Sequence, residues 1–316
     1  MRIPRRRSCD ARCVDTGVEV VIVHHRTPGP LRATLERLAA HAPTVPVTVV
    51  DTALDAGVVA DLASAHPKLA WRAAPNHSYA HAVNTGLKST TAPLVVVMNA
   101  DVLVGPDTIA DLCAACDDPR VALAGPVPRT PVGRIQDQGL PYLLHHARLR
   151  WRSWRGAGQR PPASVPVPWL AGCLLVARRS AIDRIGGMDG RLRFYNEDLE
   201  WGLRARAAGW RCVLVATDVV HLGGAATPAD GRFLVEGLRG GYALTRRTAG
   251  PPVRWAHRWL VAGAAWLAAR WVRDPRRRDA WAEVARRFVH DDLDDAPFGD
   301  TLSDGINPPR HDPAGR

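Results

Sequence analysis

PLVVVMNAD, at residues 93–101, is the stretch that decides the fold class. Its continuous apolar, β-branched run is typical of a strand buried on both faces. Helical stretches separate it from other short runs of this kind, which predicts a doubly wound α/β domain with ligands at the carboxyl ends of its strands. The other expected strands are EVVIV (19–23), VPVTVVD (45–51), LAWRAAP (69–75), CLLVARR (173–179) and WRCVLVA (210–216). The expected helices cover 31–40, a stretch through Leu62, 78–89 and 197–208.

Length and composition fit a folded, reduced protein. The chain has 316 residues, of which 46% are apolar, enough for one large domain or two small ones. The longest apolar run, Trp259–Ala269, is flanked by arginines and is shorter than the roughly 18–20 residues that a membrane span needs. The N-terminal MRIPRRRSCDARC lacks the apolar core of a secretory signal. Six cysteines are too few for a disulfide scaffold. We therefore expect a cytoplasmic protein.

The net charge of +11 is carried almost wholly by arginine, since only Lys68 and Lys88 are lysines. A basic protein commonly meets phosphate in nucleic acid, in a nucleotide or in an anionic lipid, and charge alone does not choose among them. A nucleic-acid-binding protein that uses its arginine clusters is therefore one candidate. Against it, aromatic residues alternate with basic ones only near Trp151, Trp154 and the C-terminus. The sequence therefore argues against nucleic acid as a partner.

Changes in composition along the chain suggest four segments, one of which contains a long loop. Residues 125–168 are rich in Pro, Gly, Arg and His without clear periodicity, which is typical of a functional loop or lid. The expected organisation is a disordered basic arm (1–16), a catalytic domain (17–228) that contains this loop, a C-terminal helical extension (229–290) and a disordered acidic tail (291–316).

Polar side chains stand at the ends of several expected strands. Asp51 ends one strand, Asn99 and Asp101 end another, and His221 follows a third. Asn196–Glu200 lies at an expected helix start. Taken singly, such residues are often caps, turn residues or structural histidines. Their appearance together at one edge of one sheet favours a functional site.

The order of these pieces resembles that of family-2 inverting glycosyltransferases with the GT-A fold, especially the bacterial rhamnosyltransferase-like branch. The resemblance rests on motifs from about Val18 to Gly224: VEVVIVHHR, VTVVDTALDAG, APNHSYAHAVNTGL, NAD at 99–101, the segment 168–210 and HLG at 221–223. It implies a Rossmann-like, mostly parallel sheet with helices on both faces. It also implies transfer of a sugar, rhamnose-like or another hexose, from a nucleotide-diphosphate donor to a cell-envelope or lipid-linked glycan acceptor.

The resemblance also assigns roles to individual residues. Asp198 would be the catalytic base, with Glu197 beside it, while Asp101 and His221 would bind a divalent cation, Mn2+ or Mg2+. The nucleotide sugar would be bound by Asp51, Asn76, Asn84, Gly86, Asn99 and Asp101. Because a nucleoside diphosphate gains negative charge as it leaves, a hard cation held by oxygen ligands suits the reaction. A carboxylate on the opposite face of the sugar could take the acceptor's proton.

Some features leave alternatives open. The first strand is followed by His24, His25 and Arg26 instead of the usual Thr/Ser-Tyr-Asn, and Asn99-Ala100-Asp101 keeps a single carboxylate. A catalytically silent partner subunit with this fold is therefore an alternative. Cys9, Cys13, Cys113 and Cys116 could ligate zinc, although core or surface cysteines fit their spacing better.

The C-terminal segment 253–290 is helix-like and rich in tryptophan and arginine. Trp255, Trp259 and Trp266 are spaced i, i+4 and i+11, which puts them on one helical face. Such a face beside basic residues is typical of an interfacial helix at a membrane, here the inner face of the cell membrane. A helical hairpin packed on the catalytic domain is the equal alternative.

Overall fold

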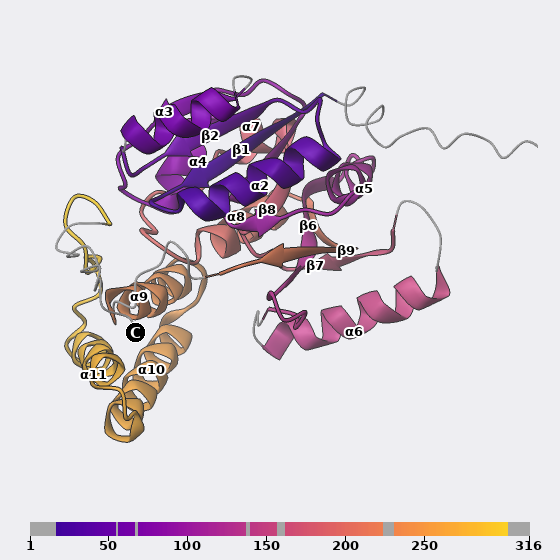
Figure 1. Cartoon of the computed structure of the whole chain (residues 1–316). Helices are drawn as coiled ribbons and strands as arrows, with labels where there is room; N and C mark the ends of the chain where they lie inside the picture. Colours follow the sequence, from indigo (N-terminus) through magenta and orange to yellow (C-terminus); the bar gives the residue numbers. More distant parts are fainter. Residues whose placement is uncertain are drawn as a thin grey trace, which may run out of the picture. The chain divides into compact units, whose positions relative to one another are not determined.

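The computed structural model describes residues 17–54, 56–66, 69–136, 140–156, 162–223 and 231–302 (Figure 1). The chain divides into two compact units. The first comprises Met1–Pro75, Tyr79–Gly190 and Asn196–Pro228, and the second comprises Asn76–Ser78, Arg191–Tyr195 and Ala229–Arg316. The expected arm at 1–16, and the part of the expected tail from 303 onward, lie outside the described residues.

The first unit is built on a nine-stranded sheet with the order β3-β2-β1-β4-β8-β6-β9-β5, and β7 pairs with β9. Its strands are β1 (Val18–His24), β2 (Val47–Asp51), β3 (Ala70–Ala73), β4 (Leu94–Asn99), β5 (Val102–Leu103), β6 (Val121–Arg129), β7 (Ser164–Val167), β8 (Leu174–Arg178) and β9 (Arg211–His221). Its helices are α2 (Pro28–His41), α3 (Ala56–Ala65), α4 (Tyr79–Lys88), α5 (Thr108–Ala115), α6 (Leu140–Arg155), α7 (Arg179–Ile185) and α8 (Glu197–Ala207). The predicted α/β class is confirmed.

Parallel pairing is concentrated in the first half of the sheet. There β1 pairs in parallel with both β2 and β4, and β2 with β3. In the second half, β8 runs antiparallel to β4 and β6, and only β6 and β9 are parallel. The expectation of a mostly parallel sheet therefore describes the first four strands, and the rest of the sheet is mixed.

Alternating side chains of the central strands pack into two separate hydrophobic cores, one on each face of the sheet. Val20 and Ile22 pack on one face with residues of α2, α3 and α5. Val21, between them, packs on the other face with residues of α4, α7 and α8. Because successive side chains of a strand point to opposite faces, a continuous apolar run is what a sheet covered on both faces requires. This is the physical basis of the pattern seen in the sequence.

The segment 125–168 is more regular than its composition indicates. It contains the end of β6, the whole of α6 and the strand β7, so the predicted loop or lid is wrong for these parts. The helical pattern is weak because α6 exposes several large apolar residues, Leu144, Trp151 and Trp154, while Leu149 is buried. A helix that keeps most of its large apolar residues exposed shows no clear buried apolar stripe.

The second unit contains three helices, α9 (Gly231–Thr248), α10 (Pro251–Trp271) and α11 (Pro275–His290), which pack against one another (Figure 1). Helix α10 begins with Pro251 and Pro252, and α11 begins with Pro275. Proline suits the first helical turn because its missing N–H would have no helical partner there. Asp274 caps α11 by accepting a hydrogen bond from the Arg276 amide, 3.0 Å. The helix-like segment 253–290 is thus two helices that form a hairpin. No helix in the described ranges has both the length and the apolar character needed to cross a bilayer.

The first part of the expected disordered tail is ordered. Residues 291–302 bury Leu293 against α9–α11, and Phe298 and Leu302 in a small cluster with Phe233. The prediction of disorder is wrong here because these three apolar anchors stand between acidic residues that dominate the composition.

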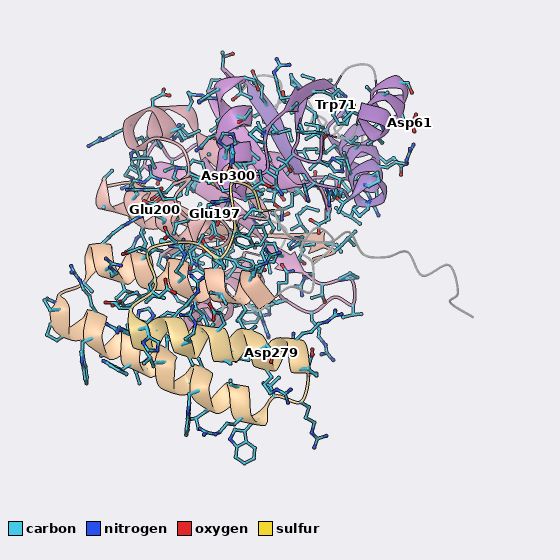
Figure 2. The ribbon with its side chains drawn as sticks, turned by 90° about the vertical axis from the view of Figure 1, so that its left-hand side faces the viewer. Asp61, Trp71, Glu197, Glu200, Asp279 and Asp300 are labelled. Carbon is cyan, nitrogen blue, oxygen red and sulfur yellow. The ribbon has the colours of Figure 1, made fainter. Side chains whose placement is uncertain are left out.

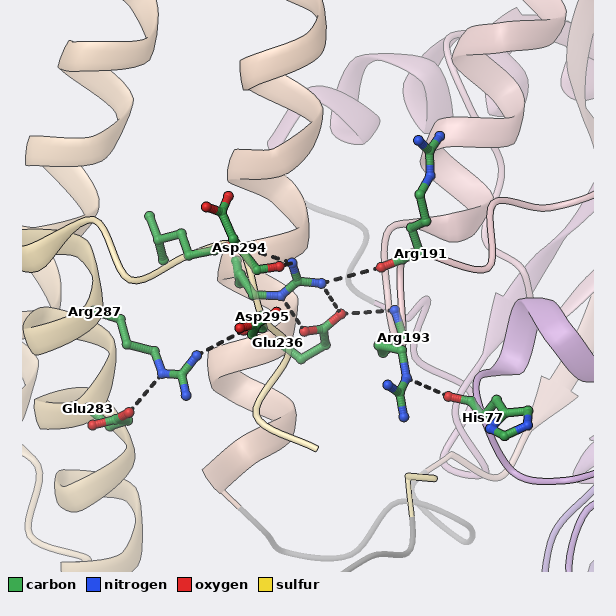
Figure 3. A network of polar contacts seen from close by, with 10 residues as sticks. His77, Arg191, Arg193, Glu236, Glu283, Arg287, Asp294 and Asp295 are labelled. Carbon is green, nitrogen blue, oxygen red and sulfur yellow. Dashed lines mark hydrogen bonds and ion pairs between the residues drawn. The ribbon is translucent and has the colours of Figure 1, made fainter. Parts of the chain in front are cut away.

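A buried ion pair joins the parts of the second unit (Figure 3). The Glu236 carboxylate accepts hydrogen bonds from Arg239 Nε, 2.7 Å, and from the Arg193 amide, 2.9 Å. Arg239 also donates to the carbonyls of Arg191, Leu293 and Asp294. Glu236 is fully buried. The Glu236–Arg239 pair on α9 thereby holds both the 191–195 segment and the chain beyond α11 in place.

Candidate functional site

The first two strands bring His24 and Asp51 side by side at the carboxyl edge of the sheet. They are register partners, and their side chains are hydrogen-bonded, with His24 Nδ1 2.9 Å from Asp51 Oδ1. The Thr27 amide donates to His24 Nε2, 3.1 Å, so Nε2 is the unprotonated nitrogen and Nδ1 donates to Asp51. The Ala53 amide also donates to Asp51 Oδ1, 3.2 Å. His24 is not one of the predicted site residues, although it directly follows the expected strand 19–23, where ligand-binding residues of α/β domains lie.

Asn99, Asp101 and His221 come together at the next part of this edge. The short strand β5 pairs with the end of β9, which sets Val102 opposite His221. The Leu222 amide donates to the Asp101 carbonyl, 3.0 Å, and holds the two chains in place. His221 Nε2 lies 3.3 Å from Asp101 Oδ1 and 3.4 Å from Asn99 Nδ2. The structure therefore brings Asn99, Asp101 and His221 together, although Asn99 and His221 are 122 positions apart in the sequence.

Gln136 fixes the orientation of the His221 ring. Its Oε1 lies 2.9 Å from His221 Nδ1. An amide oxygen only accepts, so Nδ1 carries the proton and Nε2 turns its lone pair toward Asp101. No sequence signal identified Gln136, because it belongs to the proline- and glycine-rich segment taken for a loop.

Asp198 stands at the first turn of α8. Its Oδ1 accepts a hydrogen bond from the Leu199 amide, 2.7 Å, and its Oδ2 accepts one from the Gly172 amide, 2.8 Å. Asn196, just before the helix, adopts a left-handed conformation with φ 67°, which asparagine tolerates better than most residues. Glu197 and Glu200 lie in the same turn (Figure 2). Glu197 is buried, whereas Glu200 pairs with Arg204. Burial raises the pKa of Asp198 above its ordinary value.

Backbone hydrogen bonds of Gly172 and Cys173 connect Asp198 with the cluster of Asn99, Asp101 and His221. The Gly172 amide binds Asp198, and the next residue's carbonyl, that of Cys173, accepts from the Asn99 amide, 2.9 Å. Tyr79 donates its hydroxyl to the Gly172 carbonyl, 3.1 Å. Its pKa is raised well above the usual value, first by burial and then by the negative charges of Glu197, Cys173, Asp198 and Asp101. The three carboxylates therefore lie around one buried hydroxyl.

This arrangement suits a divalent cation. His221 Nε2 and Asp101 Oδ1 lie 3.3 Å apart, and an imidazole nitrogen and a carboxylate oxygen are both metal-ligand types. Asn99 Oδ1 is buried and has no hydrogen-bond partner among the described residues. Within the same residues, no group of three or more His, Cys, Asp or Glu side chains could hold a metal. A cation held by one or two protein ligands together with substrate phosphates is nevertheless the usual arrangement for Mg2+.

Three further predicted residues have other surroundings. Asn84 uses both amide atoms on Met188, donating to its carbonyl at 2.8 Å and accepting from its amide at 2.9 Å. Gly86 is buried where a Cβ would come within 2.2 Å of Val21, so helix packing requires glycine there. Asn76 belongs to the second unit, where its carbonyl accepts from the Leu302 amide, 2.7 Å. The contacts of Asn84 and Gly86 are structural, and Asn76 belongs to the other unit.

The cysteines of the zinc alternative are core residues where the structure describes them. Cys113, on α5, and Cys116, at its C-terminal end, are buried in the core, and burial raises the pKa of Cys116 to about 12. A thiol that resists ionisation is a poor metal ligand. Cys9 and Cys13 lie outside the described residues.

A cavity of about 770 Å³ lies between α6 and the strands β6 and β9. It is lined by residues of both charge and apolar character, including Arg129, Trp151, Trp154 and Asp218. Asp218 precedes His221 on β9, and Ile135, also in the lining, precedes Gln136. The lining does not include Asn99, Asp101, Gln136 or His221.

Sheet order, helices on both faces and acidic groups at the strand ends define a GT-A type α/β domain. Solved structures with a similar fold are GalNAc-T7 with UDP, GalNAc and Mn2+, at 14% identity and TM-score 0.59, and S. aureus TarS, at 12% and 0.54. The first match covers 89% of this chain and 58% of that one, and the second 87% and 49%. Residues 16–273 match the family model "Glycosyltransferase like family 2", and the chain belongs to that family.

Relatives in sequence agree with the rhamnosyltransferase-like branch. An N-acetylglucosaminyl-diphospho-decaprenol L-rhamnosyltransferase of Mycobacterium tuberculosis is 37% identical over 141 residues, which are 40% of this chain and 46% of the relative. The O-antigen biosynthesis protein RfbC of Myxococcus xanthus is 28% identical over 160 residues, or 46% of this chain and 12% of that protein. The match therefore spans less than half the length of these curated relatives.

Proposed function

We propose that this protein is a glycosyltransferase that moves a sugar from a nucleoside diphosphate to a lipid-linked glycan by a metal-assisted, inverting displacement. The observation that carries the proposal is the convergence of Asp101, Asn99 and His221 at the sheet edge, one short backbone path away from Asp198. Family membership and the relative that acts on a diphospho-decaprenol support the substrate class. Cell-envelope glycans are the corresponding product class.

Asp101 and His221 are the residues that would hold a divalent cation. The presence of Mn2+ with UDP in the GalNAc-T7 structure supports this choice. When bound, the cation supplies Lewis-acid stabilisation of the diphosphate as it leaves. Gln136 orients the His221 ring through Nδ1, and Asn99 offers its buried Oδ1 to the same region. Asp51, held by His24, is proposed to accept a hydrogen bond from the nucleotide base.

Asp198 is the proposed base. In a one-step inversion the acceptor hydroxyl attacks the anomeric carbon, the bond to the diphosphate breaks, and the hydroxyl proton passes to Asp198. The two backbone amides that bind its oxygens fix the carboxylate in position. Its raised pKa improves it as a proton acceptor at neutral pH. Glu197, buried beside it, adds negative charge to the same region.

The cavity beneath α6 is the proposed acceptor region. Its tryptophans offer the flat apolar surfaces on which sugar rings and lipid chains pack, and Arg129 and Arg150 offer charge to a phosphate. A deoxythymidine diphosphate-rhamnose donor is our first candidate, and a uridine diphosphate sugar is the second. We place the reaction in the cytoplasm.

A thermal-shift panel of nucleotide sugars, each with and without Mn2+, tests donor use without an acceptor. The expected result is a rise in melting temperature for one nucleotide class, larger with Mn2+, because a ligand that binds the native state stabilises it. Asp101→Ala should remove the Mn2+-dependent part. A donor that binds without transfer to any lipid-linked acceptor would identify a silent GT-A protein instead. No shift with any nucleotide sugar would contradict the proposal.

A further inference from the structure

Helix α10 of the second unit turns its largest apolar side chains outward. It buries Ala262 and Ala265, while Trp255 is 67% exposed, Trp266 53% and Trp271 82%. Soluble helices normally bury their large apolar residues and expose small or polar ones. The exposed apolar set of this helix is Val253, Trp255, Trp259, Leu260, Trp266, Leu267 and Trp271.

These side chains form one continuous surface, which we call the α10 tryptophan face. With about 100° between successive residues, all seven positions fall within half of the helix circumference. Ala256 and Gly263 lie between them on that arc, together with Arg270. The structure describes α10 throughout, and along this arc Arg270 is the sole charged residue, with its guanidinium 3.4 Å from the Trp266 ring centroid. The other arginines of the helix turn to the bundle: Arg254 binds the Ala249 carbonyl, and Arg258 pairs with Asp291.

One end of this face is strongly basic. At the turn between α10 and α11 (Figure 1), arginines outnumber aspartates, and all of these side chains are exposed. The arginines are Arg270, Arg273, Arg276, Arg277 and Arg278, and the aspartates are Asp274 and Asp279. Asp274 is in addition engaged in capping α11. The turn therefore attracts anions, and two copies of it would repel each other.

The rest of the chain offers little to cover the α10 tryptophan face. Residues 1–16 contain Met1, Ile3 and Val14 as larger apolar residues, and residues 303–316 contain Ile306. A surface of tryptophans and leucines bordered by arginines matches the boundary between headgroups and acyl chains, where indole rings prefer to lie. Arginine adds attraction to anionic headgroups.

We propose that the α10 tryptophan face docks the protein on the surface of an anionic lipid bilayer. The helix would lie in the plane of the interface, with its tryptophans among the headgroups and the arginines of the turn on lipid phosphates. This inference goes beyond the proposed function and does not require it, because binding to plain vesicles involves neither donor nor acceptor. If the proposed reaction is also correct, docking brings the enzyme to a lipid-linked acceptor.

Flotation with vesicles of phosphatidylcholine, with and without about 30% phosphatidylglycerol, tests the proposal on the full chain. We expect binding to the anionic vesicles that weakens with salt, because exposed charges are screened. The triple variant Trp255→Gln, Trp259→Gln, Trp266→Gln should bind at least about tenfold more weakly, since each buried tryptophan contributes apolar area. The variant Arg276→Gln, Arg277→Gln, Arg278→Gln should lose up to about fivefold for each arginine.

The matched control is Val132→Gln, Leu144→Gln, which removes exposed apolar side chains that lie outside α10 and outside the α6 cavity lining, and it should leave vesicle binding unchanged. Quenching of tryptophan fluorescence by brominated lipids in the unaltered protein gives a second measurement that needs no variant. Absence of binding, or binding that survives the α10 triple variant and resists quenching, would overturn the proposal. A dimer that the α10 triple variant dissociates, without vesicle binding, would show that a second copy covers the face.

Discussion

Two clusters of charged side chains, one in each unit, differ in how completely the protein satisfies them. In the second unit, all five N–H groups of Arg239 have acceptors: the two oxygens of Glu236 and the carbonyls of Arg191, Leu293 and Asp294 (Figure 3). At the sheet edge of the first unit, Asp101 and His221 face each other, and Asn99 Oδ1 has no partner in the described part of the chain.

The difference separates a structural cluster from a binding one. Buried polar groups in native proteins almost always find partners, because an unsatisfied group costs about 1–3 kcal/mol. A cluster that completes itself stabilises the fold and has no capacity left for a ligand. A cluster left incomplete at the carboxyl edge of an α/β sheet is the one to test for function.

The largest expected effect comes from Asp198. Asp198→Asn removes the proposed base and one of the two acceptors that the backbone amides use, so kcat should fall by about 10²–10⁴-fold. Donor binding, measured by the Mn2+-dependent thermal shift, should persist. Glu200→Gln, a charge loss in the same turn of α8, is the matched control and should cost far less. Unchanged turnover in Asp198→Asn would remove Asp198 from the mechanism.

The structural cluster should respond in stability instead. Glu236→Gln leaves Arg239 buried without its counter-charge, and the free energy of unfolding should drop by about 3–5 kcal/mol, as measured by urea denaturation. Glu283→Gln breaks a half-exposed pair with Arg286 and Arg287 and should cost about 0–1 kcal/mol. Equal losses in the two variants would mean that burial does not set the contribution of these pairs.

The incomplete cluster should respond in metal affinity. Gln136→Leu removes the acceptor that orients His221, and Mn2+ affinity, measured by titration calorimetry, should fall about 10–100-fold. Gln136→Glu keeps an acceptor oxygen at this position and should retain most of the affinity. If both variants bind Mn2+ as the unaltered protein does, Gln136 is not a positioning residue.

The smallest expected effect is a shift, to higher pH, of the point at which kcat falls on acidification. Because burial raises the pKa of Asp198, and a base acts only when deprotonated, kcat should begin to fall on acidification at a pH above the ordinary value of about 3.9 for aspartate. A profile of kcat against pH measures this limb, and the residual activity of Asp198→Asn should lack it. A limb at or below the ordinary value would show that the working enzyme leaves this carboxylate solvated.

Much of the fold follows from the sequence, because local patterns are strong where both faces of the sheet are buried. The strands β1, β2, β4 and β8 lie where their β-branched runs predict them. The pattern fails for α6, whose apolar residues point outward, and for 291–302, where Leu293, Phe298 and Leu302 are isolated anchors. In both cases the overall composition of the segment led to the wrong prediction, because the few residues that are buried there depend on partners far away in the sequence.

By itself, the sequence determined that polar groups end several strands of one α/β domain, since strand runs and their last residues are local features. Only the tertiary structure decided which of them meet. The pairing of β5 with β9 brings Asp101 next to His221. The structure also shows that His24 binds Asp51 and that Gln136 binds His221. Asn84 instead binds the Met188 backbone, and Gly86 packs against Val21. The physical reason is that hydrogen-bond partners and close approach are set by register and crossing chains, which no local pattern encodes.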